Sequence, residues 1–128
     1  MFRAVPFLVI VVVAYNVVAL LTGPALGAAM MSATLPSGAA WNLSVGDLLI
    51  LAGVALLFLE IVKAGRTRRA GADHALSMVL FVVALLEFLL VAACGTSVFL
   101  IITALTLIDV IAGFTVSLST ARRDIAIN

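Results

Sequence analysis

The sequence predicts an all-α integral membrane protein, a bundle of four antiparallel transmembrane helices with both termini in the cytoplasm. Hydrophobic residues make up 66% of the 128 residues and charged residues only 10%, well beyond the roughly 45–50% apolar content of soluble domains. The apolar residues form four long runs. At about 20 residues for each span, four spans fill the chain as a single domain over residues 1–128.

The basic residues predict the orientation. All seven lie at the N-terminus, between the second and third apolar runs, or at the C-terminus, and the other two connections carry none. Because Lys and Arg concentrate in cytoplasmic loops, both termini and the middle loop are expected in the cytoplasm. Arginine-rich composition with abundant Ala, Val and Leu favours a bacterial protein, and hence the cell inner (plasma) membrane.

The first span is expected over about residues 5–31. Arg3 and the apolar stretch after it resemble a secretory signal, but the stretch is longer than the roughly 7–15 residues of such a core. We therefore interpret it as a retained span, which Pro24 kinks or ends near the outer face. An outer loop is expected from Ser32 to Gly46, where Trp41 suits an anchor at the membrane interface.

Three further spans are expected over about residues 46–64, 73–94 and 97–121. Ser44 and Asp47 have the spacing of a capping box that opens the second of the four spans. Asp73 is a candidate N-cap of the third. Arg122 and Arg123 are expected to end the fourth at the cytoplasmic surface.

Three polar residues interrupt the apolar runs near mid-membrane depth, namely Asn16, Glu87 and Asp109. Counted from the cytoplasmic end of each helix at 1.5 Å per residue, each lies about 18–20 Å deep, which predicts a common layer. A carboxyl group in hydrocarbon is costly, and of two that share a site at least one is expected to be protonated at neutral pH. Two interpretations stay open: a proton or cation site, and a hydrogen-bonded contact between the third and fourth helices.

Glycines recur on single faces of the predicted helices. Gly23 and Gly27 share a face with Asn16, Gly53 belongs to a seven-residue repeat, and Gly113 lies on a stripe of small and polar residues. Small residues let helix backbones approach closely in lipid. These faces are expected to point inward or toward a partner.

A cluster of basic residues is predicted at the cytoplasmic face; its members are Lys63, Arg66, Arg68, Arg69, Arg122 and Arg123. The cluster either binds anionic lipid head groups or serves only to determine topology, and both interpretations stay open. Glu60 lies three residues before Lys63, so the two are expected to form an ion pair along the helix.

Several classes of site are not expected. Cys94 is the only cysteine and His74 the only histidine, so no intramolecular disulfide, metal site or cofactor is predicted. His74 follows Asp73, but no nucleophile stands nearby in the sequence, and we predict no catalytic residues and no enzyme activity. The basic residues lack interleaved aromatic residues, which argues against a nucleic-acid partner.

The expected function is that of a small structural, accessory or interaction subunit, which forms a homo-oligomer or joins a larger membrane complex. The chain has almost no mass outside the predicted spans for chemistry or ligand capture, and its main partner is the lipid bilayer. The alternative is a protomer of a small oligomeric transporter or channel, coupled to protons or cations, that uses Glu87 and Asp109 as a carboxylate pair.

Overall fold

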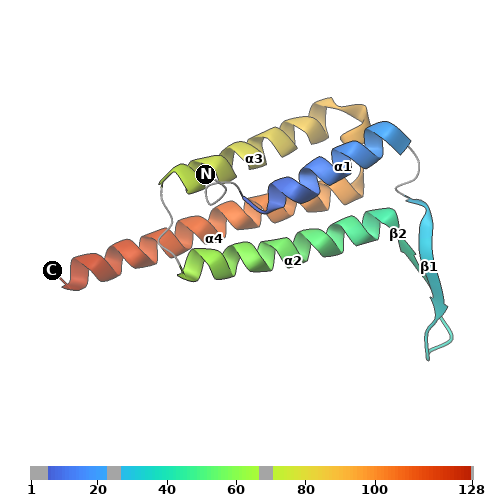
Figure 1. Cartoon of the computed structure of the whole chain (residues 1–128), viewed down its shortest axis with the longest axis horizontal. Coiled ribbons are helices and arrows are strands. Elements are labelled where there is room, and N and C mark those ends of the chain that lie inside the picture. Colours follow the sequence, from blue (N-terminus) through green and yellow to red (C-terminus); the bar gives the residue numbers. More distant parts are fainter. Residues whose placement is uncertain (1–5, 23–26, 67–70, 128) are drawn as a thin grey trace.

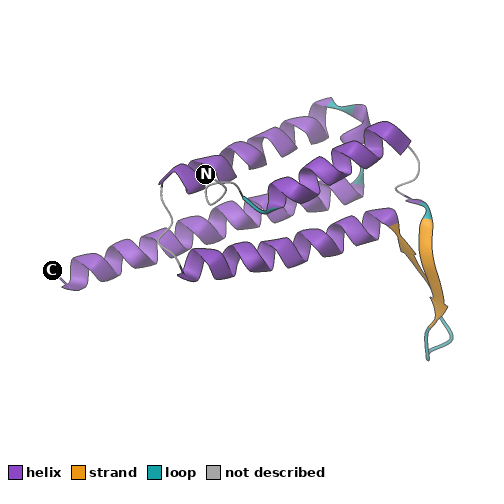
Figure 2. Ribbon diagram, in the orientation of Figure 1, coloured by secondary structure: helices purple, strands orange, loops and turns teal. Residues whose placement is uncertain are grey.

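The computed structural model describes residues 6–22, 27–66 and 71–127, and the side chains of residues 6–21, 27–63 and 74–115. Its elements are four helices and one hairpin, shown in Figures 1 and 2: α1 (Leu8–Thr22), β1 (Ala29–Thr34), β2 (Ala40–Ser44), α2 (Val45–Arg66), α3 (Gly71–Leu90), the 3-10 turn η2 (Ala92–Cys94) and α4 (Ser97–Ile127). The predominance of helix agrees with the predicted all-α class.

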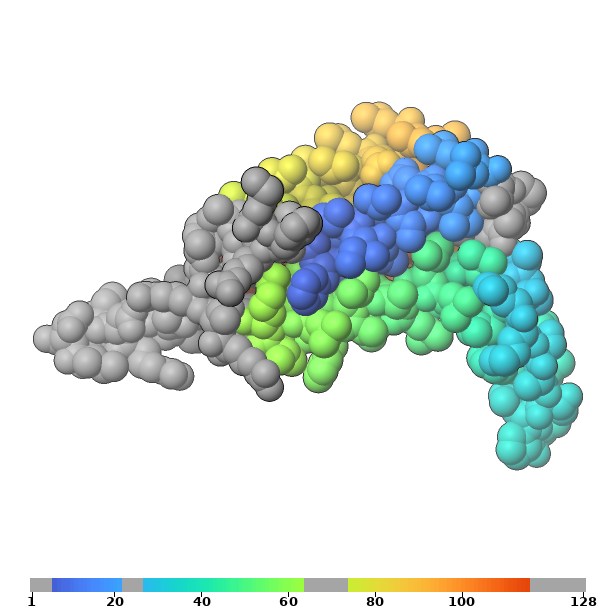
Figure 3. Space-filling model, in the orientation of Figure 1, coloured from blue at the N-terminus to red at the C-terminus, as the bar shows by residue number. Residues whose placement is uncertain are grey.

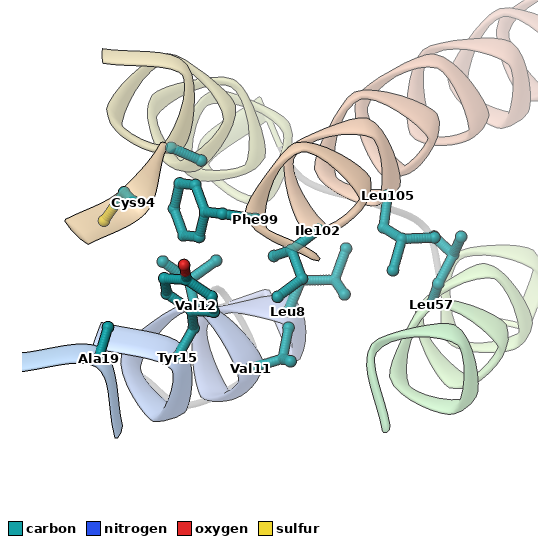
Figure 4. Packing of buried hydrophobic residues seen from close by; sticks show 11 residues of the cluster. Leu8, Val11, Val12, Tyr15, Ala19, Leu57, Cys94, Phe99, Ile102 and Leu105 are labelled. Atoms are coloured by element: carbon teal, nitrogen blue, oxygen red, sulfur yellow. The ribbon is translucent and has the colours of Figure 1, made fainter. Parts of the chain in front are cut away.

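Helix α4 is the central element of the bundle. It packs against the other three helices, and α1 also packs against α2. Figure 1 shows α2 and α3 on opposite sides of α4, with α1 lying across the front. The buried apolar core lies where α1 meets α4 and η2, around Tyr15, Phe99 and Ile102 (Figure 4).

Apolar side chains also cover the outward faces of the helices. Leu20 of α1, Phe58 of α2 and Leu90 of α3 are 67%, 65% and 77% exposed, and the helices form the long body in Figure 3. Exposed apolar surface on this scale is typical of proteins that meet lipid or a partner.

Two helical segments within the described residues are long and apolar enough to cross a membrane, Val45–Lys63 and Ser97–Thr115. The apolar segments Leu8–Leu21 and His74–Leu90 are shorter. These two candidate spans are weak evidence in favour of a membrane protein.

The predicted capping box is confirmed at the start of α2. The Ser44 backbone N–H donates to Asp47 Oδ2 over 3.0 Å, and the Asp47 backbone N–H donates to Ser44 Oγ over 3.1 Å. Each side chain satisfies an N–H group that the helix itself leaves without an acceptor. The local sequence therefore determines where α2 begins.

The predicted ends of the third and fourth helices are wrong at three points. Helix α3 begins at Gly71, so Asp73 lies inside its first turn rather than at its N-cap, and α3 ends at Leu90 rather than Cys94. Helix α4 runs to Ile127 and does not stop at Arg122 and Arg123. Arginine is a good helix former, so a change from apolar residues to arginines does not by itself end a helix.

A β-hairpin replaces the last part of the predicted first span and most of the predicted outer loop. Strands β1 and β2 pair antiparallel. At the turn between them, the Gly38 backbone N–H donates to the Leu35 carbonyl oxygen over 2.8 Å, and Gly38 has a φ of 89°, which favours glycine. Hydropathy alone does not distinguish a strand from a helix in a short apolar run, which is why the prediction was wrong here.

Candidate functional site

A groove lies between α1 and α3. It has a volume of about 540 Å³, opens to the surface along one side, and is lined by Val9, Val12, Val13, Asn16, Val17, Leu20 and Leu21 of α1 and by Leu80, Val83 and Glu87 of α3. A smaller hollow of about 190 Å³ adjoins it and shares Val9, Leu80 and Val83. Together they form one open, mostly apolar groove along the helices, whose polar lining residues are Asn16 and Glu87.

Asn16 and Glu87 contact each other across this groove. Asn16 Nδ2 donates to Glu87 Oε1 over 3.3 Å and to the Val12 carbonyl oxygen over 2.9 Å. The bond to Val12 is one turn back along α1, so it holds the amide in one orientation while the second N–H reaches α3. The structure thus brings together two of the three residues expected in the polar layer.

Cys94 completes this cluster from the turn η2. Its Sγ lies 3.6 Å from Asn16 Oδ1, as donor, and 4.0 Å from Glu87 Oε2. Burial, and secondarily the charge of Glu87, raise the pKa of the Cys94 thiol, so the thiol stays protonated and can donate. The sequence interpretation placed Cys94 in the third helix and missed this contact, because η2 turns the chain back toward α1.

Tyr15 joins α1 to the same turn, on the neighbouring face of the helix. Its hydroxyl group donates to the Ala93 carbonyl oxygen over 2.9 Å and lies 2.7 Å from Thr96 Oγ1. Because a phenol has one proton, Thr96 is the donor in the second bond. Thr96 Oγ1 also accepts from the Phe99 backbone N–H over 3.2 Å, which caps α4.

Asp109 does not join Asn16 and Glu87. The ring centroids of His74 and Phe114 lie 5.9 Å apart, which aligns those two residues of α3 and α4. At 1.5 Å per residue, Glu87 lies about 20 Å along α3 from His74, and Asp109 lies about 8 Å along α4 from Phe114, in the same direction. The two carboxyl groups are therefore separated by about 12 Å along the bundle. The predicted depth of Asp109 is counted from the C-terminal end of the fourth helix. Because α4 extends past the start of α3, that count puts Asp109 too close to the level of Glu87.

A second polar region lies nearer the other end of the bundle. Glu60 is fully buried, accepts a hydrogen bond from the Phe7 backbone N–H, and lies 3.3 Å from Lys63 Nζ in the expected ion pair. Lys63 Nζ also sits 4.3 Å from the centroid of the Phe7 ring. These contacts hold the start of α1 against the last turns of α2.

Buried threonines on α4 lie between the two polar regions. Thr103 Oγ1 donates to the Phe99 carbonyl oxygen over 2.9 Å, and Thr106 Oγ1 donates to the Thr103 carbonyl oxygen over 2.6 Å. Asp109, only 2% exposed, follows one turn later. This face of α4 is therefore polar but turned into the protein.

The glycines expected at helix contacts have different surroundings. A Cβ atom on Gly53 would come 2.8 Å from Leu105 Cδ1 and 3.7 Å from Val11, so Gly53 lies where α2 meets α1 and α4. Gly113 is buried. Gly27 faces open space, and Gly23 lies outside the described residues.

Most of the predicted basic cluster also lies outside what the structure describes. The Lys63 side chain is described and pairs with Glu60. Arg68 and Arg69 are not described, and the same holds for the side chains of Arg66, Arg122 and Arg123. Among the described residues, no group of three or more His, Cys, Asp or Glu side chains could hold a metal ion.

Comparison with protein families, with curated proteins and with solved structures finds no match to this chain.

Proposed function

We propose that the chain is a four-span protein of the inner membrane, with cytoplasmic termini, that serves as an interaction subunit. It receives a transmembrane helix of another protein in the groove between α1 and α3. The observation that carries this proposal is the Asn16–Glu87 pair, which lines an otherwise apolar groove.

Four spans are supported by the way the helices pack. Helices α1 and α3 lie alongside α4, which contains one of the two candidate spans. A bilayer that covers α2 and α4 therefore also covers α1 and α3. The outward side chains of these two shorter helices suit that environment, since Ile10, Leu20, Val79 and Leu89 are 59%, 67%, 57% and 64% exposed.

A helix suits the shape of the groove, which follows α1 and α3 from Pro6 and Leu76 at one end to Leu21 and Glu87 at the other. The glycines at positions 53 and 113 are turned into the bundle itself and do not form a surface for a partner, whereas the groove is open. In lipid, such contacts gain their stability from packing and from interhelical hydrogen bonds.

The carboxyl group of Glu87 indicates the chemistry of the partner. A basic side chain on the incoming helix would complement it with both charge and hydrogen-bond donors. Residues 4–62 and 70–121 of this chain contain no Lys or Arg. A second copy inserted in the same orientation could not supply that group near Glu87, so the partner is a different protein.

Crosslinking in native membranes tests where the partner binds. A photoreactive residue at Val13 or Val17, both exposed in the groove, is expected to crosslink to a transmembrane peptide that contains Lys or Arg. The same residue at Phe58, exposed on α2, is the control and is expected not to capture that peptide. Crosslinks to lipid alone, or to a second copy of the chain, would contradict the proposal.

Binding of a defined probe tests the role of Glu87. Two Leu-rich transmembrane peptides, one with a single Lys a turn from its end and one with Leu there, are compared by energy transfer to the reconstituted protein. The Lys peptide is expected to associate more strongly, and Glu87→Leu is expected to abolish the difference. Equal association of both peptides with the wild-type protein would refute the assignment.

The transporter alternative is a second proposal, favoured by the buried polar side chains of Thr103, Thr106 and Asp109 on α4. Glu87, which is half-buried, adds a carboxyl group in the lining of the groove. Proton flux into proteoliposomes tests it. If the chain conducts, Glu87→Gln and Asp109→Asn should each abolish flux without lowering the melting temperature, whereas Asp47→Asn, which alters an exposed carboxyl group, should leave flux intact. Absence of flux in the wild-type protein would exclude transport of protons.

A further inference from the structure

The hairpin has one apolar and one polar face. In its register Met31 pairs with Leu43 and Ala33 with Trp41, so these four side chains share one face. The alternate pairs, Ser32 with Asn42 and Thr34 with Ala40, form the other face. There Ser32 Oγ donates to Asn42 Oδ1 over 2.7 Å, a cross-strand bond on the side that suits water.

The apolar face is left uncovered by the described part of the chain. Every residue from Gly27 to Asn42 is exposed, and Met31 and Trp41 are 51% and 38% exposed. A two-stranded hairpin alone is marginally stable in water and needs its apolar face packed against something else. This face is therefore open to an occupant other than the described helices.

The position of the hairpin indicates which occupant fits. Figure 1 shows β1 and β2 extending away from one end of the bundle, across the direction of the helices. Its base is joined to α2 directly, since the Val45 backbone N–H donates to the Ala28 carbonyl oxygen over 3.2 Å. When the helices cross a bilayer, a hairpin in this position runs along the bilayer surface.

The composition of the segment fits the same surface. Residues 27–46 contain no charged side chain, so insertion into the interface would bury no charge. Trp41 is the only tryptophan, and tryptophan is enriched at the boundary between head groups and hydrocarbon, where its ring is apolar and its N–H bonds with water or head groups.

We infer that the apolar face formed by Met31, Ala33, Trp41 and Leu43 lies in the lipid interface of the leaflet opposite the termini. The hairpin is thus a bilayer-binding surface. It sets how deeply the bundle lies in the bilayer and the level at which α2 enters it. This inference rests on the proposed membrane-spanning bundle. It does not depend on which molecule occupies the groove between α1 and α3.

The single tryptophan makes the inference directly measurable. The protein is reconstituted at a high lipid-to-protein ratio, and Trp41 emission is quenched by lipids labelled at a shallow or a deep acyl position. We expect blue-shifted emission, stronger quenching by the shallow label, and protection from aqueous iodide. Trp41→Phe gives the background from Tyr15. Emission that iodide quenches and lipid labels do not would overturn the inference.

Variants on the two faces provide a matched comparison. Ala33→Asp places a charge beside Trp41 on the apolar face, and Thr34→Asp places the same charge one residue away on the polar face. Lipid quenching of Trp41 should be lost in the first and retained in the second. Equal quenching in both variants would show that the face does not touch lipid.

Flotation with the liposomes tests the membrane-spanning bundle separately from the hairpin. Protein that fails to float, or that alkaline carbonate extracts, contradicts the proposed membrane-spanning bundle. Protein that floats and resists extraction but leaves Trp41 open to iodide contradicts only the hairpin inference. Quenching that changes when the protein is diluted in lipid would indicate that a second copy covers the face instead, and would also overturn it.

Discussion

The Tyr15 hydroxyl group donates a hydrogen bond to the carbonyl oxygen of Ala93 over 2.9 Å, across 78 positions of the sequence. This contact ties α1 to the turn that leads from α3 into α4. Tyr15 is fully buried and also lies against the ring of Phe99, with the ring centroids 4.7 Å apart. Tyr15 therefore helps to hold together the end of the bundle that carries the Asn16–Glu87 pair.

Tyr15→Phe should destabilise the protein while keeping the ring contact with Phe99. The change leaves the Ala93 carbonyl oxygen and the Thr96 hydroxyl group, both in half-buried residues, without the Tyr15 hydroxyl group, at a cost of about 1–3 kcal/mol in the free energy of unfolding. Unfolding in detergent measures the effect. Thr96→Ser, which retains the hydroxyl group, is the control and should stay close to wild type; a Tyr15→Phe protein as stable as wild type would contradict the role of the hydroxyl.

Gly53→Val should destabilise the contact between α2 and α4. Even the first added carbon would lie 2.8 Å from Leu105 Cδ1, and overpacking of this kind costs about 1–3 kcal/mol. Ala52→Val, on the exposed neighbouring position, should be close to neutral. Because Leu105 is the obstacle, Leu105→Ala should be less harmful in the Gly53→Val protein than in wild type. Simple additivity of the two changes would contradict this packing.

Glu60→Leu should loosen the start of α1. The Phe7 backbone N–H donates to Glu60, and a buried N–H that loses its acceptor costs about 1–3 kcal/mol. Glu60→Gln keeps an acceptor oxygen and should cost less. Hydrogen exchange at the first amides of α1 reports the local effect, which should be larger for Leu than for Gln. Equal exchange in the two variants would show that Glu60 does not cap α1.

Alkylation of Cys94 should depend on pH in a predictable direction. Burial and then the Glu87 charge raise its pKa, so less thiolate is present at any given pH and the rate–pH curve lies at higher pH than for free cysteine. Glu87→Gln removes the charge and should move the curve back toward lower pH. The denatured protein, which has lost both effects, is the reference. A curve in the folded protein that matches the denatured one would contradict the buried cluster.

Short-range features of this chain were predictable from its sequence. The Ser44–Asp47 capping box and the Glu60–Lys63 pair involve residues three positions apart, and both are present. Each of the four apolar runs likewise contains one of the four helices, in order, although the first run also reaches into β1. These features depend on helix geometry and on neighbouring side chains, so a local pattern is sufficient to find them.

Features that depend on how helices are aligned were not predictable in the same way. Asp109 was placed level with Glu87 by counting from helix ends, but the alignment of His74 with Phe114 puts the two carboxyl groups at different levels. Hydropathy predicts helix and loop where the hairpin lies, because it carries no information on the pairing of β1 with β2. The contacts of Cys94 required η2 to bring the chain back toward Asn16.

The sequence by itself determined that this chain is a set of apolar helices, where α2 begins, and which few polar side chains those helices carry. Only the tertiary structure decided that Asn16 meets Glu87 in a groove between α1 and α3, that Asp109 lies elsewhere, and that an amphipathic hairpin projects from one end. The physical reason is that composition and periodicity act within a helix. The level at which one helix packs on another depends on side chains distant in sequence.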